Sequence, residues 1–212
     1  MLLFFKTKFA LWRDQLRTVF LFYRRPRFAL LDLAFGLSYL FSNPFSLCRR
    51  TMQKRGEQEI HAYGETPLAA WKKIAAIARI GRDDVFLDLG CGRGKLCFWT
   101  ACWIGCKTMG VDWVPAFVRR GSLLARLFRL KHLQFTQAAL SEISLKEATV
   151  LYLYTFHPEE ERLDFSQLPS GARVITVSEE LSHPDFRVEA SLPVQFPWGE
   201  TELFIHRVSR PE

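Results

Sequence analysis

The sequence has no C-x-x-C pair among its five cysteines, and no histidine lies close in sequence to Cys91, Cys97, Cys102 or Cys106. Structural metal sites usually bring such ligands together at short, regular spacing. We therefore expect no zinc or other metal site. The odd cysteine count fits reduced, buried thiols in a cytosolic setting and gives no sign of a disulfide framework.

The sequence also lacks internal repeats and low-complexity tracts, and 49% of it is hydrophobic, with 14% aromatic residues. This composition suits a buried core and excludes a disordered chain. The 212 residues fit one α/β domain with an extension and are too few for two comfortable domains. The net charge of +7 favours an acidic partner such as nucleic acid, a ribosome or an anionic membrane, although a solvated basic surface explains it nearly as well.

Residues 1–55 form a basic, aromatic-rich region that we expect to be a helical extension of a domain at 56–212. Apolar residues recur there at steps of three and four, which predicts one amphipathic helix. The stripe consists of Leu2, Phe5, Phe9, Trp12, Leu16, Val19 and Tyr23. The next stretch, Phe28–Leu47, approaches the ~20 residues that a bilayer span needs, but Asp32, Gly36 and Asn43-Pro44 weaken that interpretation.

Three interpretations of this region stay open. Residues 1–47 could lie on an anionic membrane or a membrane protein, with or without a short anchor. They could instead form a helical cap packed on the domain or on another subunit. A cleaved targeting segment is the third, although the start lacks a charged n-region and a small-residue cleavage site. We predict a cytoplasmic protein, either free or peripheral on or anchored to a membrane.

The stretch Val85–Lys95, VFLDLGCGRGK, predicts a buried strand that ends near an acid, Asp88, and opens into a glycine-rich loop. Ligands of open α/β sheets bind at that edge. Gly90, Gly92 and Gly94 let the backbone turn sharply and lie close against a flat ligand. Because one residue separates each pair of glycines, the loop departs from the G-x-G-x-x-G of dinucleotide-binding proteins.

Strands and helices alternate regularly after Thr66, with five β–α units followed by a hairpin. This order predicts an α/β fold with a seven-stranded, mostly parallel sheet and an antiparallel C-terminal hairpin. The expected strands are Val85–Leu89, Lys107–Asp112, Leu133–Gln137, Thr149–Thr155, Arg173–Ser178, Arg187–Phe196 and Glu202–Val208; the expected helices are 66–80, Lys95–Trp103 and Pro115–Leu130. Asp112 ends the second strand at the distance from the loop where a ribose-binding acid is expected.

The acid-x-Gly-x-Gly-x-Gly loop resembles motif I of the class I S-adenosylmethionine-dependent methyltransferases. Together with Tyr63-Gly64-Glu65-Thr66 and the GVD ending at Asp112, it resembles the disruptor-of-telomeric-silencing family of non-SET lysine methyltransferases. Residues 63–208 are similar to small archaeal protein-lysine methyltransferases and to the mitochondrial ATP-synthase c-subunit lysine methyltransferases. The resemblance implies a Rossmann-like sheet, S-adenosylmethionine as cofactor and a protein lysine as substrate.

The resemblance also implies which residues bind the cofactor. Tyr63–Thr66 would cover its methionine end, and Asp88 would orient the loop and the amino-acid end. The full set is Tyr63, Gly64, Glu65, Thr66, Asp88, Gly90, Cys91, Gly92, Gly94, Asp112 and Ala139. The sequence departs from the family twice. Gln137-Ala138-Ala139 replaces the acid expected near the adenine, and Tyr154-Thr155-Phe156-His157 replaces the Asn-Asn-Phe run of the eukaryotic histone enzymes.

Methyl transfer from a sulfonium is an in-line displacement, so alignment dominates catalysis. A lysine nucleophile must be neutral, and an aromatic slot lowers its pKa by disfavouring the ammonium. The candidates for this slot are Tyr154, Phe156 and Tyr63, although ordinary packing at a strand end explains them as well. His157 could receive the proton through water, or it is a surface histidine beside Pro158.

Two other function classes stay open. The basic charge favours a nucleic-acid methyltransferase, but the sequence has neither an Asp/Asn-Pro-Pro-aromatic motif after the fourth strand nor a Pro-Cys pair. Methylation of RNA ribose, a lipid or a small molecule is therefore the alternative to protein lysine. The second class is a non-catalytic scaffold with a methyltransferase fold, which the missing acid at Ala139 supports.

Overall fold

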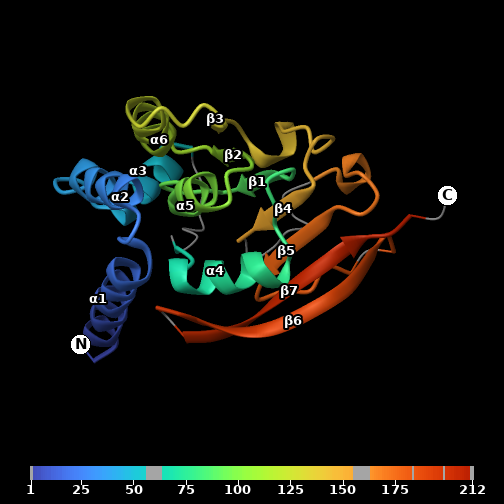
Figure 1. The fold of residues 1–212 in the computed structure, drawn as a ribbon, viewed down its shortest axis with the longest axis horizontal. Helices are drawn as coiled ribbons and strands as arrows, with labels where there is room; N and C mark the ends of the chain where they lie inside the picture. Colours follow the sequence, from blue (N-terminus) through green and yellow to red (C-terminus); the bar gives the residue numbers. More distant parts are fainter. Residues whose placement is uncertain (1, 56–63, 155–162, 183, 198, 211–212) are drawn as a thin grey trace.

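An open seven-stranded sheet forms the centre of the molecule (Figure 1). The computed structural model describes residues 2–55, 64–154, 163–182, 184–197 and 199–210. The strands are β1 (Val85–Leu89), β2 (Lys107–Asp112), β3 (Leu133–Gln137), β4 (Val150–Leu153), β5 (Arg173–Val177), β6 (Phe186–Phe196) and β7 (Gly199–Val208). Their order is β3-β2-β1-β4-β5-β7-β6. The first five are parallel and β7 is antiparallel to both its neighbours, which confirms the predicted sheet.

Helices cover one face of this sheet. Those of the domain are α4 (Leu68–Ile77), α5 (Lys95–Trp103) and α6 (Pro115–Leu127). Trp71 of α4 packs against Phe86 of β1 and Tyr152 of β4, with ring centroids 5.1 Å apart in both pairs. Because side chains alternate along a strand, Leu87 and Leu89 of β1 face the other side and form a separate core with Leu151 and other residues.

The second face differs from the expected series of five β–α units. The connection from β3 to β4 contains one 3-10 turn, η1 (Leu140–Glu142), and the described part of the next connection contains another, η2 (Phe165–Gln167). Residues 138–149 are too few to hold a helix of several turns and also return to the start of β4. The loops cover the core with single buried side chains, such as Leu145 and Leu168.

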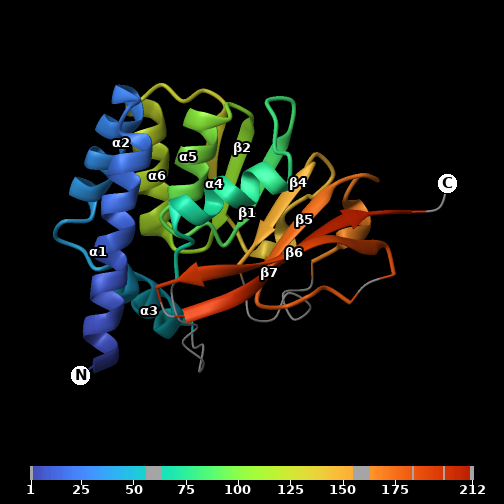
Figure 2. The ribbon, with the colours of Figure 1, turned by 60° about the horizontal axis from the view of Figure 1, so that its bottom comes forward.

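Three helices precede the domain: α1 (Leu2–Phe22), α2 (Pro26–Ser38) and α3 (Pro44–Arg55). The predicted N-terminal helix is present as Leu2–Phe22, but several residues of the predicted apolar stripe do not pack on the protein. Thr18 and Phe22 are fully buried, whereas Phe9 and Trp12 are 61% and 58% exposed. Figure 2 shows α1 and α2 side by side at one end of the molecule.

The apolar stretch Phe28–Leu47 is divided between α2 and α3. Asp32 lies on the buried side of α2, where it accepts hydrogen bonds from Gln15 Nε2 (3.1 Å) and the Tyr23 hydroxyl (2.9 Å). In the described part of the chain, no helix combines the length and apolar character needed to cross a membrane.

Candidate active site

The candidate site lies where β1, β2 and β4 end. In the register of the sheet, Asp88 stands beside Gly110 of β2 and Tyr152 of β4. The connections from β1 to β2 and from β3 to β4 leave this edge in opposite directions, since β4 pairs with the other side of β1. Such a switch point opens a crevice for ligands in open α/β sheets.

The glycine-rich loop adopts the backbone conformations that its sequence predicts. Gly90, Gly92 and Gly94 have φ values of +75°, +55° and +82°, in the region where a Cβ is unfavourable. The amides of Gly90 and Cys91 both donate to the Val111 carbonyl oxygen at 2.9 Å. The loop is thereby fastened to the end of β2. A Cβ built on Gly90 would have no protein atom within 4 Å, so the loop leaves open space beside its backbone.

Asp112 joins the loop to the end of β2. Its Oδ2 accepts the Gly92 amide and its Oδ1 accepts the Val114 amide, each at 2.8 Å. Burial raises the pKa of Asp112 to about 6, and the hydrogen bonds from Val114 and Gly92 act in the opposite direction. Each carboxylate oxygen keeps a second lone pair, so Asp112 can hold the loop and still accept hydroxyl groups.

Asp88 is 3% exposed at the end of β1. Its Oδ2 accepts a hydrogen bond from Cys97 Sγ at 3.3 Å. Burial raises the pKa of Asp88 to about 7; the Cys97 hydrogen bond lowers it and the nearby charge of Asp112 raises it further. A carboxylate with one weak donor can accept further hydrogen bonds, so Asp88 is suited to a cationic ligand group.

The segment before α4 closes onto the loop through an ion pair. Arg93 donates from Nε and Nη2 to the two carboxylate oxygens of Glu65, both at 2.6 Å. The guanidinium of Arg93 also lies over the rings of Phe35 and Tyr39, 4.7 and 4.9 Å from their centroids. Glu65, the loop and α2 are therefore held together by one side chain.

Two more contacts place the same segment against the end of β4. The hydroxyls of Thr66 and Tyr152 are hydrogen-bonded at 2.5 Å. Gly64 lies so close to Tyr154 that an added Cβ would be 2.7 Å from the Tyr154 hydroxyl oxygen. The centroid of the Tyr154 ring is 5.3 Å from that of Phe196, which is buried at 2% exposure, so Tyr154 packs on an aromatic residue of the core.

Ala139, at the position where an acid was expected, directly precedes the turn η1. Its amide donates to Oε2 of Glu142 at 3.3 Å. Glu142 is exposed and brings a carboxylate to the position where the sequence shows none. The short 3-10 turn places residue 142 beside residue 139. The residues at the end of β3 therefore gave no sign of the Glu142 carboxylate.

The structure thus brings together nine of the predicted residues at one edge: Gly64, Glu65, Thr66, Asp88, Gly90, Cys91, Gly92, Asp112 and Tyr154. Gly94 closes the loop by donating to the Cys91 carbonyl at 2.9 Å, and Ala139 follows β3. Tyr63, Phe156 and His157 lie outside the described residues.

The sequence interpretation missed the contribution of the N-terminal helices. Besides the contacts of Arg93 with Phe35 and Tyr39, Lys95 at the start of α5 pairs with Asp14 of α1 at 3.3 Å. In each of these contacts the two residues are more than fifty positions apart in the sequence. The only local signal was that Arg93 lies between two loop glycines. α1 and α2 therefore support the loop directly.

Comparison with known proteins gives one family match. A family model described as histone methylation protein DOT1 matches residues 52–140, which include the segment before α4, the loop, Asp112 and Ala139. No curated protein matches the chain significantly.

Solved structures share the fold. An RNA methyltransferase from Salinibacter ruber, in complex with S-adenosyl-L-homocysteine, has a TM-score of 0.61 at 22% identity, over 70% of this chain and 95% of that one. TrmN from Thermus thermophilus has a TM-score of 0.55 at 16% identity, over 65% and 47%. A geranyl diphosphate C-methyltransferase from Streptomyces coelicolor A3(2) has a TM-score of 0.53 at 14% identity, over 80% and 99%. The chain has the fold of class I S-adenosylmethionine-dependent methyltransferases.

Two glycine substitutions can distinguish the effect of ligand contact at Gly90 from the effect of backbone strain. Gly90 and Gly105 have φ values of +75° and +84°, and an added Cβ meets no atom within 4 Å at either position. We expect Gly90→Ala and Gly105→Ala to lower the free energy of unfolding equally, by about 1–2 kcal/mol. Only Gly90→Ala should weaken cofactor binding in calorimetry. Equal affinities in the two variants would show that no ligand lies against this loop.

The buried carboxyls predict how stability depends on pH. The pKa values of Asp88 and Asp112 are raised to about 7 and about 6, above the ~3.9 of an unfolded aspartate. Between these values the folded state binds more protons, so its stability falls as the pH rises. We expect urea unfolding of the ligand-free protein to show this loss between about pH 4 and pH 7.

Substitution of Asp88 measures its own contribution to the pH dependence of stability. Asp88→Asn should flatten this dependence, whereas Asp83→Asn, at an exposed position, should leave it unchanged. Each unit of pKa difference corresponds to about 1.4 kcal/mol. The assignment is wrong if Asp88→Asn keeps the full slope.

Proposed function

We propose that this protein is an S-adenosylmethionine-dependent methyltransferase that modifies a protein lysine. The main support is that three features meet at one edge of the sheet. They are the glycine loop, the carboxylates of Asp88 and Asp112, and the Gly64–Thr66 segment, which contacts Tyr152 and Tyr154. The DOT1 family match over residues 52–140 supports the same assignment.

The described residues fit S-adenosylmethionine. Asp112 would accept the ribose hydroxyls, and the loop backbone at Gly90 would lie against the ligand in the space that no protein atom fills. Asp88 would bind the cationic amino-acid end, and Glu142 would accept a hydrogen bond from the adenine amino group. These donors and acceptors are complementary to a ligand with two hydroxyls, an ammonium and a sulfonium.

When bound, a sulfonium donor supplies the methyl group. Transfer to the target amine would form an N–C bond and break the C–S bond, with the electron pair left on sulfur. A free lysine has a pKa of ~10.4, so a neutral amine at pH 7 costs about 4.6 kcal/mol. The ring of Tyr154, packed on Phe196, would wall an apolar slot that lowers this cost by desolvating the ammonium. The proton released after transfer leaves to water.

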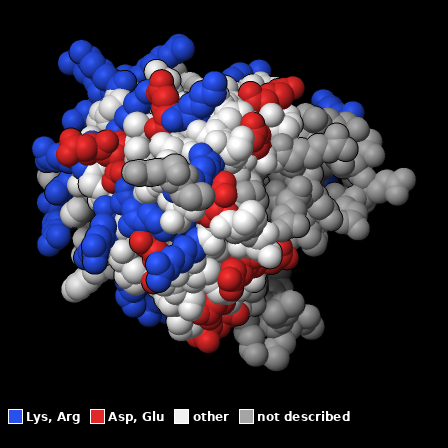
Figure 3. All heavy atoms as spheres, turned by 90° about the vertical axis from the view of Figure 1, so that its right-hand side faces the viewer, with Lys and Arg blue, Asp and Glu red and all other residues white. Residues whose placement is uncertain are grey.

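RNA is the second candidate substrate, and one observation favours it. An open groove of about 510 Å³ lies between α6 and the edge strand β3, and three of its lining residues, Arg126, Arg129 and Lys131, are basic. Figure 3 shows a face on which Lys and Arg gather mainly to the left, with Asp and Glu both among them and toward the bottom. The groove suits a phosphate backbone.

The decisive experiment is transfer from tritiated S-adenosylmethionine to a source-cell extract, followed by separation into protein, RNA and lipid. We expect a discrete labelled protein whose label survives acid and maps to lysine. Label confined to RNA or to lipid would contradict the lysine assignment and identify the substrate class. Calorimetry of the purified protein tests the cofactor separately, because a non-catalytic scaffold need not bind S-adenosylmethionine.

A further inference from the structure

The N-terminal helices leave a large apolar surface uncovered. On α1 the side opposite Thr18 and Phe22 carries exposed apolar residues, and α2 repeats the arrangement opposite Leu31 and Phe35. We define the outer face of α1–α2 as Phe9, Trp12, Leu16, Val19, Phe20, Leu30, Leu33, Leu37, Leu40 and Phe41, each at least 40% exposed. Phe20 and Phe41 are 90% and 96% exposed. Patches of this kind on soluble proteins usually mark an interaction site.

The spacing on each helix shows that the exposure is systematic. Residues 9, 12, 16, 19 and 20 of α1 fall on one side of a 3.6-residue helix, as do residues 30, 33 and 37 of α2. Each helix therefore has two apolar sides, one packed on the protein and one uncovered. The two helices lie at the same end of the molecule (Figures 1 and 2).

The charges around this face have one sign. Residues 9–54 contain eight basic residues, all exposed: Arg13, Arg17, Arg24, Arg25, Arg27, Arg49, Arg50 and Lys54. Three of them contact the domain: Arg24 and Arg25 lie over the Trp103 ring, Arg25 donates to the Cys102 carbonyl and Arg27 donates to the Phe128 carbonyl. We call the other five, Arg13, Arg17, Arg49, Arg50 and Lys54, the basic rim. The same stretch contains two acids, Asp14 and Asp32. Asp32 is 8% exposed and hydrogen-bonded to Gln15 and Tyr23, and Asp14 pairs with Lys95. The region therefore presents no exposed carboxylate.

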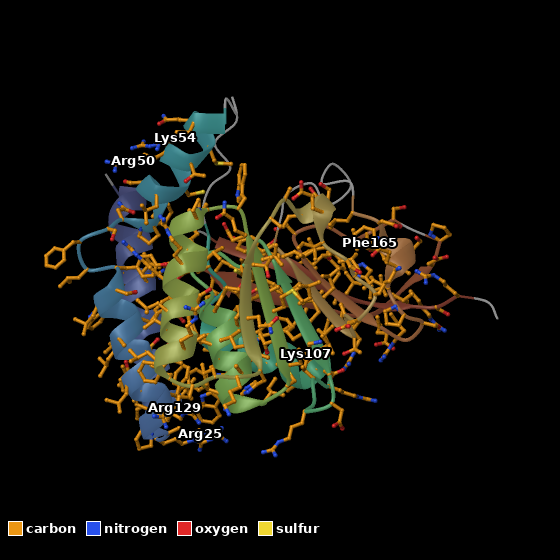
Figure 4. All side chains as sticks on the ribbon, turned by 90° about the horizontal axis from the view of Figure 1, so that it is seen from above. Arg25, Arg50, Lys54, Lys107, Arg129 and Phe165 are labelled. Carbon is orange, nitrogen blue, oxygen red and sulfur yellow. The ribbon has the colours of Figure 1, made fainter. Side chains whose placement is uncertain are left out.

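Figure 4 shows how labelled basic residues bracket α2. Arg25 lies at one end of the helix, whereas Arg50 and Lys54 lie on α3, beyond its other end. Apolar side chains flanked by Arg and Lys are the pattern of a helix that lies in the plane of a membrane surface. None of the described helices can span a bilayer, so such contact would be at the surface.

We propose that the outer face of α1–α2 docks on an anionic lipid bilayer, with its apolar residues in the boundary between headgroups and acyl chains. The basic rim would contact lipid phosphates and carboxylates. A second copy of the chain is a poorer occupant, because a self-complementary interface would bring two basic rims together. Docking would hold the catalytic domain next to the membrane, where substrates at the bilayer surface are concentrated.

Flotation of the full chain with lipid vesicles tests this proposal. We expect binding to vesicles of phosphatidylcholine with phosphatidylserine, and much weaker binding to phosphatidylcholine alone. Phe20→Asp combined with Leu37→Asp should abolish the binding. Arg13→Gln combined with Arg17→Gln should weaken it by about fivefold for each charge, and added salt should do the same.

The matched control also replaces two exposed apolar residues by aspartate, at positions away from α1 and α2. Ile77→Asp combined with Val188→Asp changes exposed apolar residues on α4 and β6 and should leave vesicle binding intact. Thermal unfolding checks that each variant folds. The proposal fails if the wild-type chain does not float with anionic vesicles, or if both aspartate pairs act alike. It also fails if Phe20→Asp with Leu37→Asp dissociates a dimer in light scattering without affecting lipid.

Discussion

Asp112→Ala is expected to abolish measurable binding of S-adenosylmethionine while the chain stays folded. The variant removes the acceptor for the Gly92 and Val114 amides and the proposed acceptor for the ribose hydroxyls. Hydrogen bonds to a charged group contribute about 1.5–3 kcal/mol each, so losing two ribose contacts weakens affinity roughly hundredfold or more. Calorimetric titration with the cofactor measures the effect.

Two companion variants keep this result interpretable. Asp112→Asn preserves the shape and one carbonyl acceptor, so its affinity should lie between those of the wild type and Asp112→Ala. Asp83→Ala, at an exposed position before β1, should bind normally. Unchanged affinity in Asp112→Ala, with an intact thermal transition, would refute the ribose role and leave Asp112 as a loop anchor alone.

Tyr154→Ala is expected to lower the rate of methyl transfer roughly hundredfold, with a much smaller change in cofactor affinity. The Tyr154 ring packs against Phe196 and lies close to Gly64, where it would wall the slot for the incoming amine. Misplacing a reacting group by about an ångström costs on the order of a hundredfold in rate. Single-turnover transfer and calorimetry, on the same preparation, separate the two effects.

The hydroxyl and the ring of Tyr154 can be distinguished. Tyr154→Phe keeps the ring and should retain most of the transfer rate if the slot acts by desolvation. It should lose as much as Tyr154→Ala if the hydroxyl positions the amine. Equal losses of binding and transfer in Tyr154→Ala would count against its placement beside the substrate, because the ring would then be supporting the cofactor site.

The sheet and its functional edge follow from local patterns. The short apolar run Val85–Leu89, interrupted by Asp88 and ended by glycines, specifies a buried strand and a loop with positive φ, and the structure has both. The expected bounds of β1, β2 and β3 agree with the observed ones, because turn residues delimit them clearly. The second face was less predictable, since residues 138–149 hold a 3-10 turn in place of a helix.

The sequence predicted the parts of the site that consist of residues close together in the chain. It did not predict the contacts between distant segments that form only when the chain packs. The glycine loop and the positions of Asp88 and Asp112 at strand ends follow from spacing along the chain. The link from Glu65 through Arg93 to Phe35 and Tyr39 does not, because it joins three distant segments. Glu142 was missed for a related reason, since a tight turn carries its carboxylate back to Ala139.

The sequence by itself determined the amphipathic N-terminal helix, the parallel sheet and the glycine loop, because periodicity, turn residues and backbone freedom act over a few neighbouring residues. The tertiary structure alone decided which side of α1 is packed. Thr18 and Phe22 face the domain while Phe9, Trp12 and Leu16 stay exposed. An apolar stripe shows that a helix has something to bury, but what covers it depends on surfaces brought together only when the whole chain folds.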